Sequence, residues 1–224
     1  LITTNKIKYI IYEKIVSSKV NDYKKIISLV NKKNIKAFVN FPRREYDLFN
    51  YIKNKIYKNS NFFLYINYKK INLDLNLIHY LDLFQFFKKT KNLKLIYQKL
   101  DKRIYKSKRR NFIEFKGKIA YSNDFNDYIF IDEYKNNLNF FLIKIDSNIF
   151  VIFEDQNIYI EIDLTKGTII KKKYKNYLQS ELTLKYLQKL ISNKKIKLTK
   201  LEEALFTHKP LINTFNNHLK LISN

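Results

Sequence analysis

The chain contains no Cys, Met or Trp, and only two Gly and two Pro among its 224 residues. Without Cys it can form neither a disulfide bond nor a thiolate metal site. Its three histidines, His79, His208 and His218, lie far apart and fit no known ligand spacing, so we expect no metal and no other cofactor. The same scarcity, with an excess of Lys, Asn, Ile, Phe and Tyr, is what an AT-rich genome encodes by default.

The absence of Met extends to position 1, which is Leu1. Either a non-standard start codon is translated literally or the initiator is missing, and a small organellar genome fits the first option. Residues 1–20 have neither the long apolar run of a secretory signal nor the Arg of a transit peptide. We therefore expect an organelle-encoded protein of the mitochondrion.

Long hydrophobic runs are also missing. The longest one, at residues 139–153, is interrupted by Lys144, Asp146 and Asn148 and falls short of the ~18 apolar residues that span a membrane. Because the composition is 46% hydrophobic and 16% aromatic, the chain is not disordered either. The sequence predicts a soluble protein with no membrane partner.

Acidic residues are scarce, since 20 Asp and Glu stand against 44 Lys and Arg, which gives a formal charge of +24. This balance indicates a polyanionic partner. Drift in an AT-rich genome supplies part of the Lys excess, so the five Arg are more informative: Arg43, Arg44, Arg103, Arg109 and Arg110. A guanidinium group matches phosphate geometry, so this clustering favours phosphate binding, with a solvated basic face as the alternative.

The first half of the chain shows alternating helical and strand patterns. Apolar spacing predicts a helix at 21–33, a strand at 35–41 ended by Pro42, a helix at about 44–57, and a β-hairpin from 62–68 and 71–78. Residues 80–89 give no clear pattern, and 92–100 read as a strand. The basic segment 103–110 then forms a bridge to the second half.

The second half consists of short β segments followed by a helical tail. The segments are 112–121, 128–134, 138–145, 149–153, 158–162 and 168–173, a spacing typical of a small sheet domain or barrel. Gly167 can close a tight turn after Thr165 and Lys166, because Gly accepts a positive φ. From residue 177 the spacing is helical again, and Pro210 should break the tail before a last short helix.

These patterns predict an α+β protein made of two small domains, an N-terminal α-β-α-β-β unit and a mostly β C-terminal unit, with a helical C-terminal extension. The predicted boundaries are 1–20 for an N-terminal extension, 21–110 and 111–176 for the two domains, and 177–224 for the extension.

Four stretches within residues 21–155 stand out together: IISLVNKKNIKAFVNFPRREYDLFNYIKNKIYKNSNFF, INLDLNLIHY, LIYQKLDKRIYKSK and GKIAYSNDFN. In their order and spacing they resemble the bacterial and organellar small-subunit ribosomal protein eight family, in which Gly117 and Ser122 match a loop that approaches rRNA. In that loop the family's Thr, second Ser, Lys and final Gly are replaced by Asn123, Asp124, Phe125 and Asn126.

The resemblance implies a structural protein of the mitochondrial small ribosomal subunit that binds central-domain rRNA and contacts neighbouring ribosomal proteins through its extension. It implies no enzymatic role and no small-molecule substrate. The RNA-binding residues expected from charge, polarity and this resemblance are Lys24, Lys25, Lys32, Lys33, Arg43, Arg44, Arg103, Tyr105, Lys106, Lys108, Arg109, Arg110, Lys116, Lys118, Ser122, Asn123, Lys171, Lys172 and Lys173.

Three alternatives remain open. Residues 113–173, with the turn DLTKG at 163–167, are similar to translation initiation factor one, an OB-fold protein. Asp124, Asp127, Asp132 and Glu133 crowd one β region and could bind Mg²⁺ in a nuclease, although no known nucleotide-binding or hydrolase motif occurs. A peripheral membrane subunit held by basic charge is the third alternative.

Overall fold

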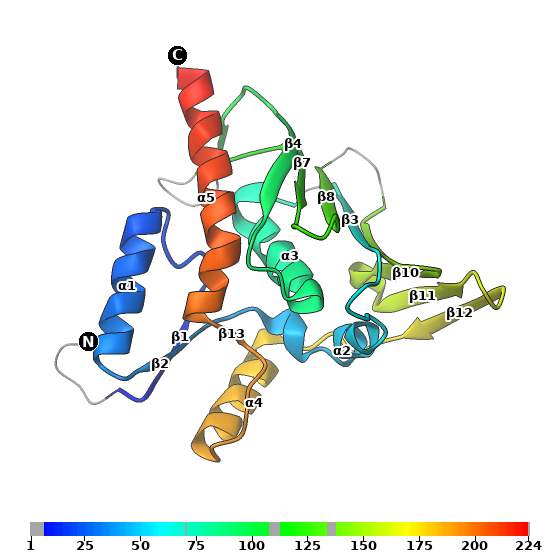
Figure 1. The fold of residues 1–224 in the computed structure, drawn as a ribbon, viewed down its shortest axis with the longest axis horizontal. Helices are drawn as coiled ribbons and strands as arrows, with labels where there is room; N and C mark the ends of the chain where they lie inside the picture. The colour runs from blue at the N-terminus through cyan, green and yellow to red at the C-terminus, as the bar shows by residue number, and fades with distance from the viewer. Residues whose placement is uncertain (1–6, 70, 108–112, 134–137, 224) are drawn as a thin grey trace.

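An eight-stranded mixed sheet forms the centre of the computed structural model, which describes residues 7–69, 71–107, 113–133 and 138–223 (Figure 1). Its strands, in spatial order, are β12 (Thr168–Lys173), β11 (Ile158–Asp163), β10 (Asn148–Phe153), β9 (Phe140–Ile145), β3 (Phe62–Tyr68), β8 (Tyr128–Glu133), β7 (Gly117–Ser122) and β4 (Lys94–Leu100). β3 pairs in parallel with β8, and the other neighbours in the sheet are antiparallel.

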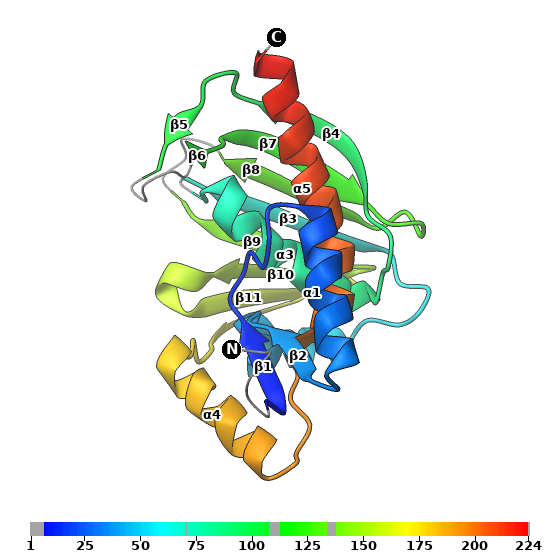
Figure 2. The ribbon, with the colours of Figure 1, turned by 90° about the vertical axis from the view of Figure 1, so that its left-hand side faces the viewer.

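Helices cover one face of this sheet. α3 (Leu73–Lys88) and α5 (Leu201–Ser223) lie side by side against it (Figures 1 and 2). Alternate side chains of β3, Phe62, Leu64 and Ile66, are buried in the core. The opposite face carries half-exposed rings, among which Tyr65 stacks on Phe130 at a centroid distance of 5.8 Å.

A smaller sheet contains β1 (Tyr9–Tyr12), β2 (Lys36–Val39) and β13 (Thr199–Lys200), in the order β1-β2-β13. β1 and β2 run in parallel, and α1 (Val20–Lys32) is the crossover between them. The buried Tyr23 of α1 donates a hydrogen bond of 3.1 Å to the carbonyl of Leu201, which ties the crossover helix to α5.

The remaining elements are η1 (Pro42–Glu45), α2 (Asp47–Asn54), η2 (Glu154–Gln156), α4 (Gln179–Ile191) and the two-stranded ribbon of β5 (Tyr105–Lys106) and β6 (Ile113–Glu114). Of these, η1 and α2 connect β2 to β3, and α4 connects β12 to β13, so they link the two sheets. In η1, Arg44 forms a buried bidentate pair with Asp82 of α3, with N–O distances of 2.8 and 2.7 Å. Thr199 of β13 donates to the same carboxylate at 2.6 Å, so this pair joins the small sheet to α3.

Most of the elements predicted from the sequence are confirmed. α1, β2, β3 and β4 lie where a helix or strand was expected, and so do the strands from β7 to β12. Gly167 has φ of +65° in the turn before β12, as the turn prediction required. The second predicted helix is present as η1 followed by α2.

The predicted strand at 71–78 is wrong, because these residues begin α3. Ile71, Leu73, Leu75 and Leu77 alternate with polar residues and imitate a strand. The helix is buried on nearly all sides, with eleven buried residues, so it has no single apolar stripe.

The predicted break at Pro210 is also wrong, since α5 continues from Leu201 to Ser223. Proline removes one backbone donor, but the residues around it, including His208 and Leu211, are buried against α1 and α3. Tertiary packing therefore holds the helix across the proline. The tail is part of the core, and no helix in the described ranges is long and apolar enough to cross a membrane.

The coarse α+β class is confirmed, but strands from both sides of residue 110 share one open sheet. β3 and β4 belong to the predicted first domain, yet β3 lies between β9 and β8, and β4 pairs with β7. The prediction of a separate small sheet or a closed barrel in the second half is therefore wrong. The predicted boundary near residue 110 does not coincide with an edge of a sheet.

We predict that Asp82→Ala lowers the free energy of unfolding by about 3–5 kcal/mol, because Arg44 is left buried without its counterion. Urea unfolding followed by circular dichroism measures the loss. The control is Asp22→Ala, which removes an exposed pair with Lys25 and should change stability by less than about 1 kcal/mol. Equal effects of the two substitutions would contradict the structural role of the buried pair.

Candidate functional site

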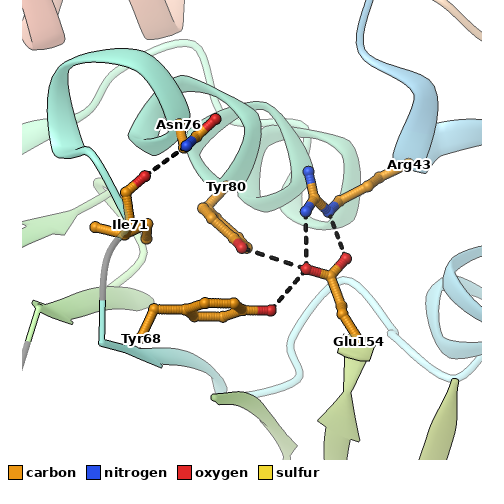
Figure 3. A pocket seen from close by; sticks show the side chains of 6 residues that line it. All are labelled: Arg43, Tyr68, Ile71, Asn76, Tyr80 and Glu154. Carbon is orange, nitrogen blue, oxygen red and sulfur yellow. Dashed lines mark hydrogen bonds and ion pairs between the residues drawn. The ribbon is translucent and has the colours of Figure 1, made fainter. Parts of the chain in front are cut away.

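A small pocket with a volume of about 200 Å³ opens between η1, the end of β3 and the first turns of α3 (Figure 3). It is lined by Arg43, Tyr68, Ile71, Asn76, Tyr80 and Glu154. The lining comes from η1, the end of β3, the first turns of α3 and the start of η2. Because these elements are far apart in the sequence, only the folded chain brings the residues together.

The carboxylate of Glu154 is the centre of this pocket. Arg43 donates to it from Nε at 3.0 Å and from Nη2 at 2.8 Å, and the hydroxyls of Tyr68 and Tyr80 donate to Oε2 at 2.7 and 3.4 Å. Figure 3 shows all three side chains pointing at Glu154. Burial alone raises the pKa of Glu154, but the charge and hydrogen bonds of Arg43 and the two hydroxyls outweigh it and hold the pKa below its ordinary value.

Arg43 retains donors that Glu154 does not use. Its Nη1 has no partner among the described residues, and Figure 3 shows this nitrogen pointing away from the carboxylate. The side chain is 19% exposed, and its guanidinium carbon lies 4.8 Å from the centre of the Tyr80 ring. A guanidinium fixed by one carboxylate can thus present its free N–H groups to a second acceptor.

Lys14, which follows β1, brings a second positive charge to the same region. Its Nζ donates to the carbonyl of Leu75 at 2.6 Å and to Oδ1 of Asn76 at 3.3 Å. The amide nitrogen of Asn76 donates in turn to the carbonyl of Ile71. These bonds fix the Lys14 ammonium and the Asn76 carboxamide at the first turn of α3.

His79 lies one turn further along α3. Its ring packs edge-on against Phe41 at 5.6 Å, and its Nδ1 is buried without a hydrogen-bond partner in the described part of the chain. Burial lowers the pKa of His79 well below its usual value, and the positive charges of Arg43 and Lys14 lower it further. The imidazole is therefore neutral at physiological pH and is a weak base.

Two carboxylates beyond Asn76 titrate near neutrality. Burial raises the pKa of Asp74 to about 6, and burial raises that of Glu133 to about 7. The negative charge of Glu114 acts on both, and Lys116 opposes the shift of Glu133. Because Glu114 belongs to β6, these two carboxylates lie on the β6 side of α3.

The structure separates the residues expected to bind RNA. Lys24, Lys25, Lys32 and Lys33 are exposed on α1, Lys171, Lys172 and Lys173 are exposed on β12, and Arg103, Tyr105, Lys106 and Lys116 lie around the β5–β6 ribbon. Arg43 and Arg44 are engaged by Glu154 and Asp82, Lys118 pairs with Asp132, and Ser122 and Asn123 are buried. Lys108, Arg109 and Arg110 lie outside the described residues.

The carboxylates considered for Mg²⁺ do not converge. Asp124 is paired with Lys94, Asp127 with Lys88 and Asp132 with Lys118, at 2.9, 3.2 and 2.8 Å. Within the described ranges no three acidic or imidazole side chains form a group that could hold a metal. The predicted cluster therefore consists of separate ion pairs.

Reasoning from the sequence missed most of the pocket. Of its lining residues only Arg43 was singled out, and for a different partner. Tyr68, Tyr80 and Glu154 carry no motif, and Lys14 is one of many lysines. A signal was present in α3, where Asn76, His79 and Tyr80 share a helical surface, but only if the segment is read as a helix.

Solved structures that share this fold include oxidoreductases and Gal80p. A Gfo/Idh/MocA family oxidoreductase from Vibrio cholerae has a TM-score of 0.65 at 11% identity and covers 96% of this chain and 71% of its own. An oxidoreductase from Agrobacterium radiobacter in complex with NAD+, L-tartaric acid and magnesium gives 0.62 at 12% identity, with 90% and 68% covered. A super-repressor mutant of Gal80p from Saccharomyces cerevisiae gives 0.66 at 10%, with 95% and 70% covered.

Comparisons by sequence show less about this chain than the structural comparisons do. No family model matches the chain. The DNA mismatch repair protein MutL of Buchnera aphidicola is 30% identical over 118 residues, which is 52% of this chain. The chain spans about a fifth of the length of that relative, since 20% of it is covered.

These findings overturn the ribosomal interpretation. The fold is that of Gfo/Idh/MocA oxidoreductases, so the resemblance to small-subunit ribosomal protein eight was wrong. The predictions that depended on it were also wrong: a structural role in translation, rRNA and ribosomal-protein partners, and a lack of enzymatic activity. The initiation-factor alternative fails as well, because its strands belong to an open sheet. The resemblance depended on a hairpin at 71–78 that is a helix. A mitochondrial location stays a prediction.

We predict that Glu133→Gln stabilises the protein at pH 8. The folded pKa of about 7 lies above the unfolded value of 4.5, so ionisation at high pH destabilises the native state. The substitution removes this penalty, and we expect a gain of about 1–3 kcal/mol above pH 7 that shrinks through the window from 7 to 4.5 and vanishes below it. Urea unfolding at several pH values tests this.

The control for this prediction is Glu202→Gln, which changes an exposed carboxylate on α5. It should show no comparable gain. A Glu133→Gln effect that is independent of pH would mean that packing, and not burial of the charge, determines the result.

Proposed function

We propose that this chain provides the substrate-binding part of an oxidoreductase of the Gfo/Idh/MocA type. The observation that carries the proposal is the pocket of Arg43, Asn76 and Glu154, with Lys14 and His79 beside it, placed between η1, β3 and α3 in a fold shared with oxidoreductases over more than nine-tenths of the chain. Junctions between sheets and helices are common places for small-molecule sites.

A nicotinamide dinucleotide is the cofactor that this fold suggests, because one structural relative was solved with NAD+. A dinucleotide's pyrophosphate normally requires a Gly-rich turn between a strand and the N-terminus of a helix. The connection between β1 and α1, residues 13–19, contains no Gly, since Gly117 lies in β7 and Gly167 in the turn before β12. These residues do not fit the pyrophosphate, so its binding is assigned to no residue of this chain.

What this chain's own residues can do is bind the oxygen atoms of a polar ligand. Nη1 of Arg43, directed away from Glu154, can donate to such an oxygen (Figure 3). We assign no proton transfer to His79, because its depressed pKa makes the imidazole a weak base.

A ligand-binding regulator without catalysis is the second candidate. Two observations favour it: Gal80p, which the solved structure describes as a super-repressor, shares the fold, and this chain carries no Gly-rich turn of its own. Both candidates require a small molecule in the pocket. Turnover of that molecule is therefore the property that distinguishes them.

We predict that the protein binds small hydroxylated ligands in this pocket, as measured by isothermal titration calorimetry. Lys14→Met should weaken this binding about 10-fold, because the hydrogen bonds of Lys14 to Leu75 and Asn76 fix the carboxamide that lines the pocket. The matched control, Lys24→Met on the exposed surface of α1, should change the affinity less than about 2-fold.

An affinity that is unaffected by Lys14→Met would contradict the assignment of this site. Ligand binding without any change in absorbance at 340 nm when NAD+ or NADP+ is added would favour the regulator.

A further inference from the structure

A lysine near the end of α2, Lys53, has surroundings that make its amine a nucleophile. We propose that Lys53 is a modification site, acylated by a small anionic acyl donor of the acyl phosphate class. Its ammonium lies over the ring of Phe86, has no counterion and is surrounded by other cations. Neither residue lines the pocket around Glu154, so this site is independent of the function proposed above.

The lack of a counterion is the first argument. Nζ of Lys53 forms no hydrogen bond or ion pair in the described part of the chain and lies 3.5 Å from the centroid of the Phe86 ring. That ring is 7% exposed, so it excludes water from one side of the ammonium. Lys55, two positions further along, has the opposite surroundings, because its Nζ pairs with Glu161 at 2.8 Å.

The neighbouring cations are the second argument. The guanidinium carbon of Arg44 lies 5.4 Å from the centroid of the same Phe86 ring. The ammonium of Lys197 donates to Oδ1 of Asn50 at 2.6 Å, and Asn50 precedes Lys53 by three positions on α2, on the same surface of the helix. Two fixed positive charges therefore stand close to Lys53 and disfavour its charged form.

The protonation of Lys53 agrees with this geometry. Burial lowers its pKa to about 8, and the charges of Arg44, Lys89 and Lys197 act in the same direction, while Asp82 opposes them. A substantial fraction of the amine is therefore neutral at physiological pH, and the neutral amine is the nucleophile. The side chain is half-buried, and Nζ is not one of the described buried nitrogens that lack a partner, so a small molecule can reach it.

The acyl transfer requires only the amine and the donor. The neutral amine of Lys53 attacks the carbonyl carbon of the acyl phosphate, and a C–N bond forms. The bond from that carbon to the phosphate oxygen breaks, and the oxygen leaves with the electron pair. The proton of the nitrogen passes to the phosphate, so the products are an amide and hydrogen phosphate. Lys89 and Lys197, both exposed, attract the phosphate group of the donor.

Incubation of the folded protein with acetyl phosphate at pH 7.5, followed by mass spectrometry of each lysine, tests the proposal. Lys53 should be acetylated at least ~10-fold faster than Lys55, which is paired, and than Lys24, which is exposed on α1. In concentrated urea the three rates should become similar, because the surroundings are lost. Equal rates in the folded protein, or a preference that persists in urea, would overturn the proposal.

A variant tests the role of the neighbouring cations. Lys197→Met should slow the acetylation of Lys53 by about 3-fold, because one of the charges that disfavour the ammonium is removed. The matched control, Lys33→Met at an exposed position after α1, should leave the rate unchanged. An unchanged rate in a folded Lys197→Met variant would contradict the role of these cations.

A neutral acyl donor, phenyl acetate, tests the class of the donor. Its preference for Lys53 over Lys55 should be smaller than that of acetyl phosphate, because the neighbouring cations do not attract it. An equal preference with both donors would overturn the assignment of an anionic donor.

Discussion

Two consecutive arginines in η1 hold the architecture together. Arg44 is neutralised by Asp82 on α3, and that carboxylate also accepts from Thr199 of β13, so one buried charge joins the small sheet to the helix that covers the large one. Arg43 points to Glu154, at the end of β10. Because a buried charge without a partner is strongly destabilising, both contacts constrain how the two sheets meet.

The candidate site is a consequence of this arrangement. The pair of Arg43 and Glu154 forms one wall of the pocket, and the first turns of α3, fixed by Lys14, form the other. A group that stabilises the fold therefore also presents free donors to a ligand. The same geometry explains why His79 stays neutral, since burial and two neighbouring positive charges act on it together.

The sequence predicted the local elements well and their assembly poorly. Period-two alternation in β3 and helical spacing in α1 are local signals, so both were found. Nothing local indicates that β3 lies between β9 and β8, because that depends on contacts across more than 60 residues. In α3, burial on most sides removed the one-sided stripe, and the chance alternation from Ile71 to Leu77 favoured the wrong element.

The candidate site was predicted poorly for the same reason, because it depends on contacts between distant parts of the chain. Arg43 was noticed for its charge, but its role depends on Glu154, which lies 111 positions further along the chain. The abundance of lysine drew attention to exposed surfaces on α1 and β12, whereas Lys14 differs from other lysines only by its place next to α3. Composition indicated a polyanion, whereas the fold gathers Arg43, Tyr68, Tyr80 and Glu154 around a small pocket.

The binding of small hydroxylated ligands, measured by isothermal titration calorimetry, tests the central claim most directly. The account predicts that the double substitution Arg43→Gln with Glu154→Gln, which removes both charges from the lining of the pocket, abolishes this binding. A folded double variant that binds as tightly as the wild-type protein would contradict the account.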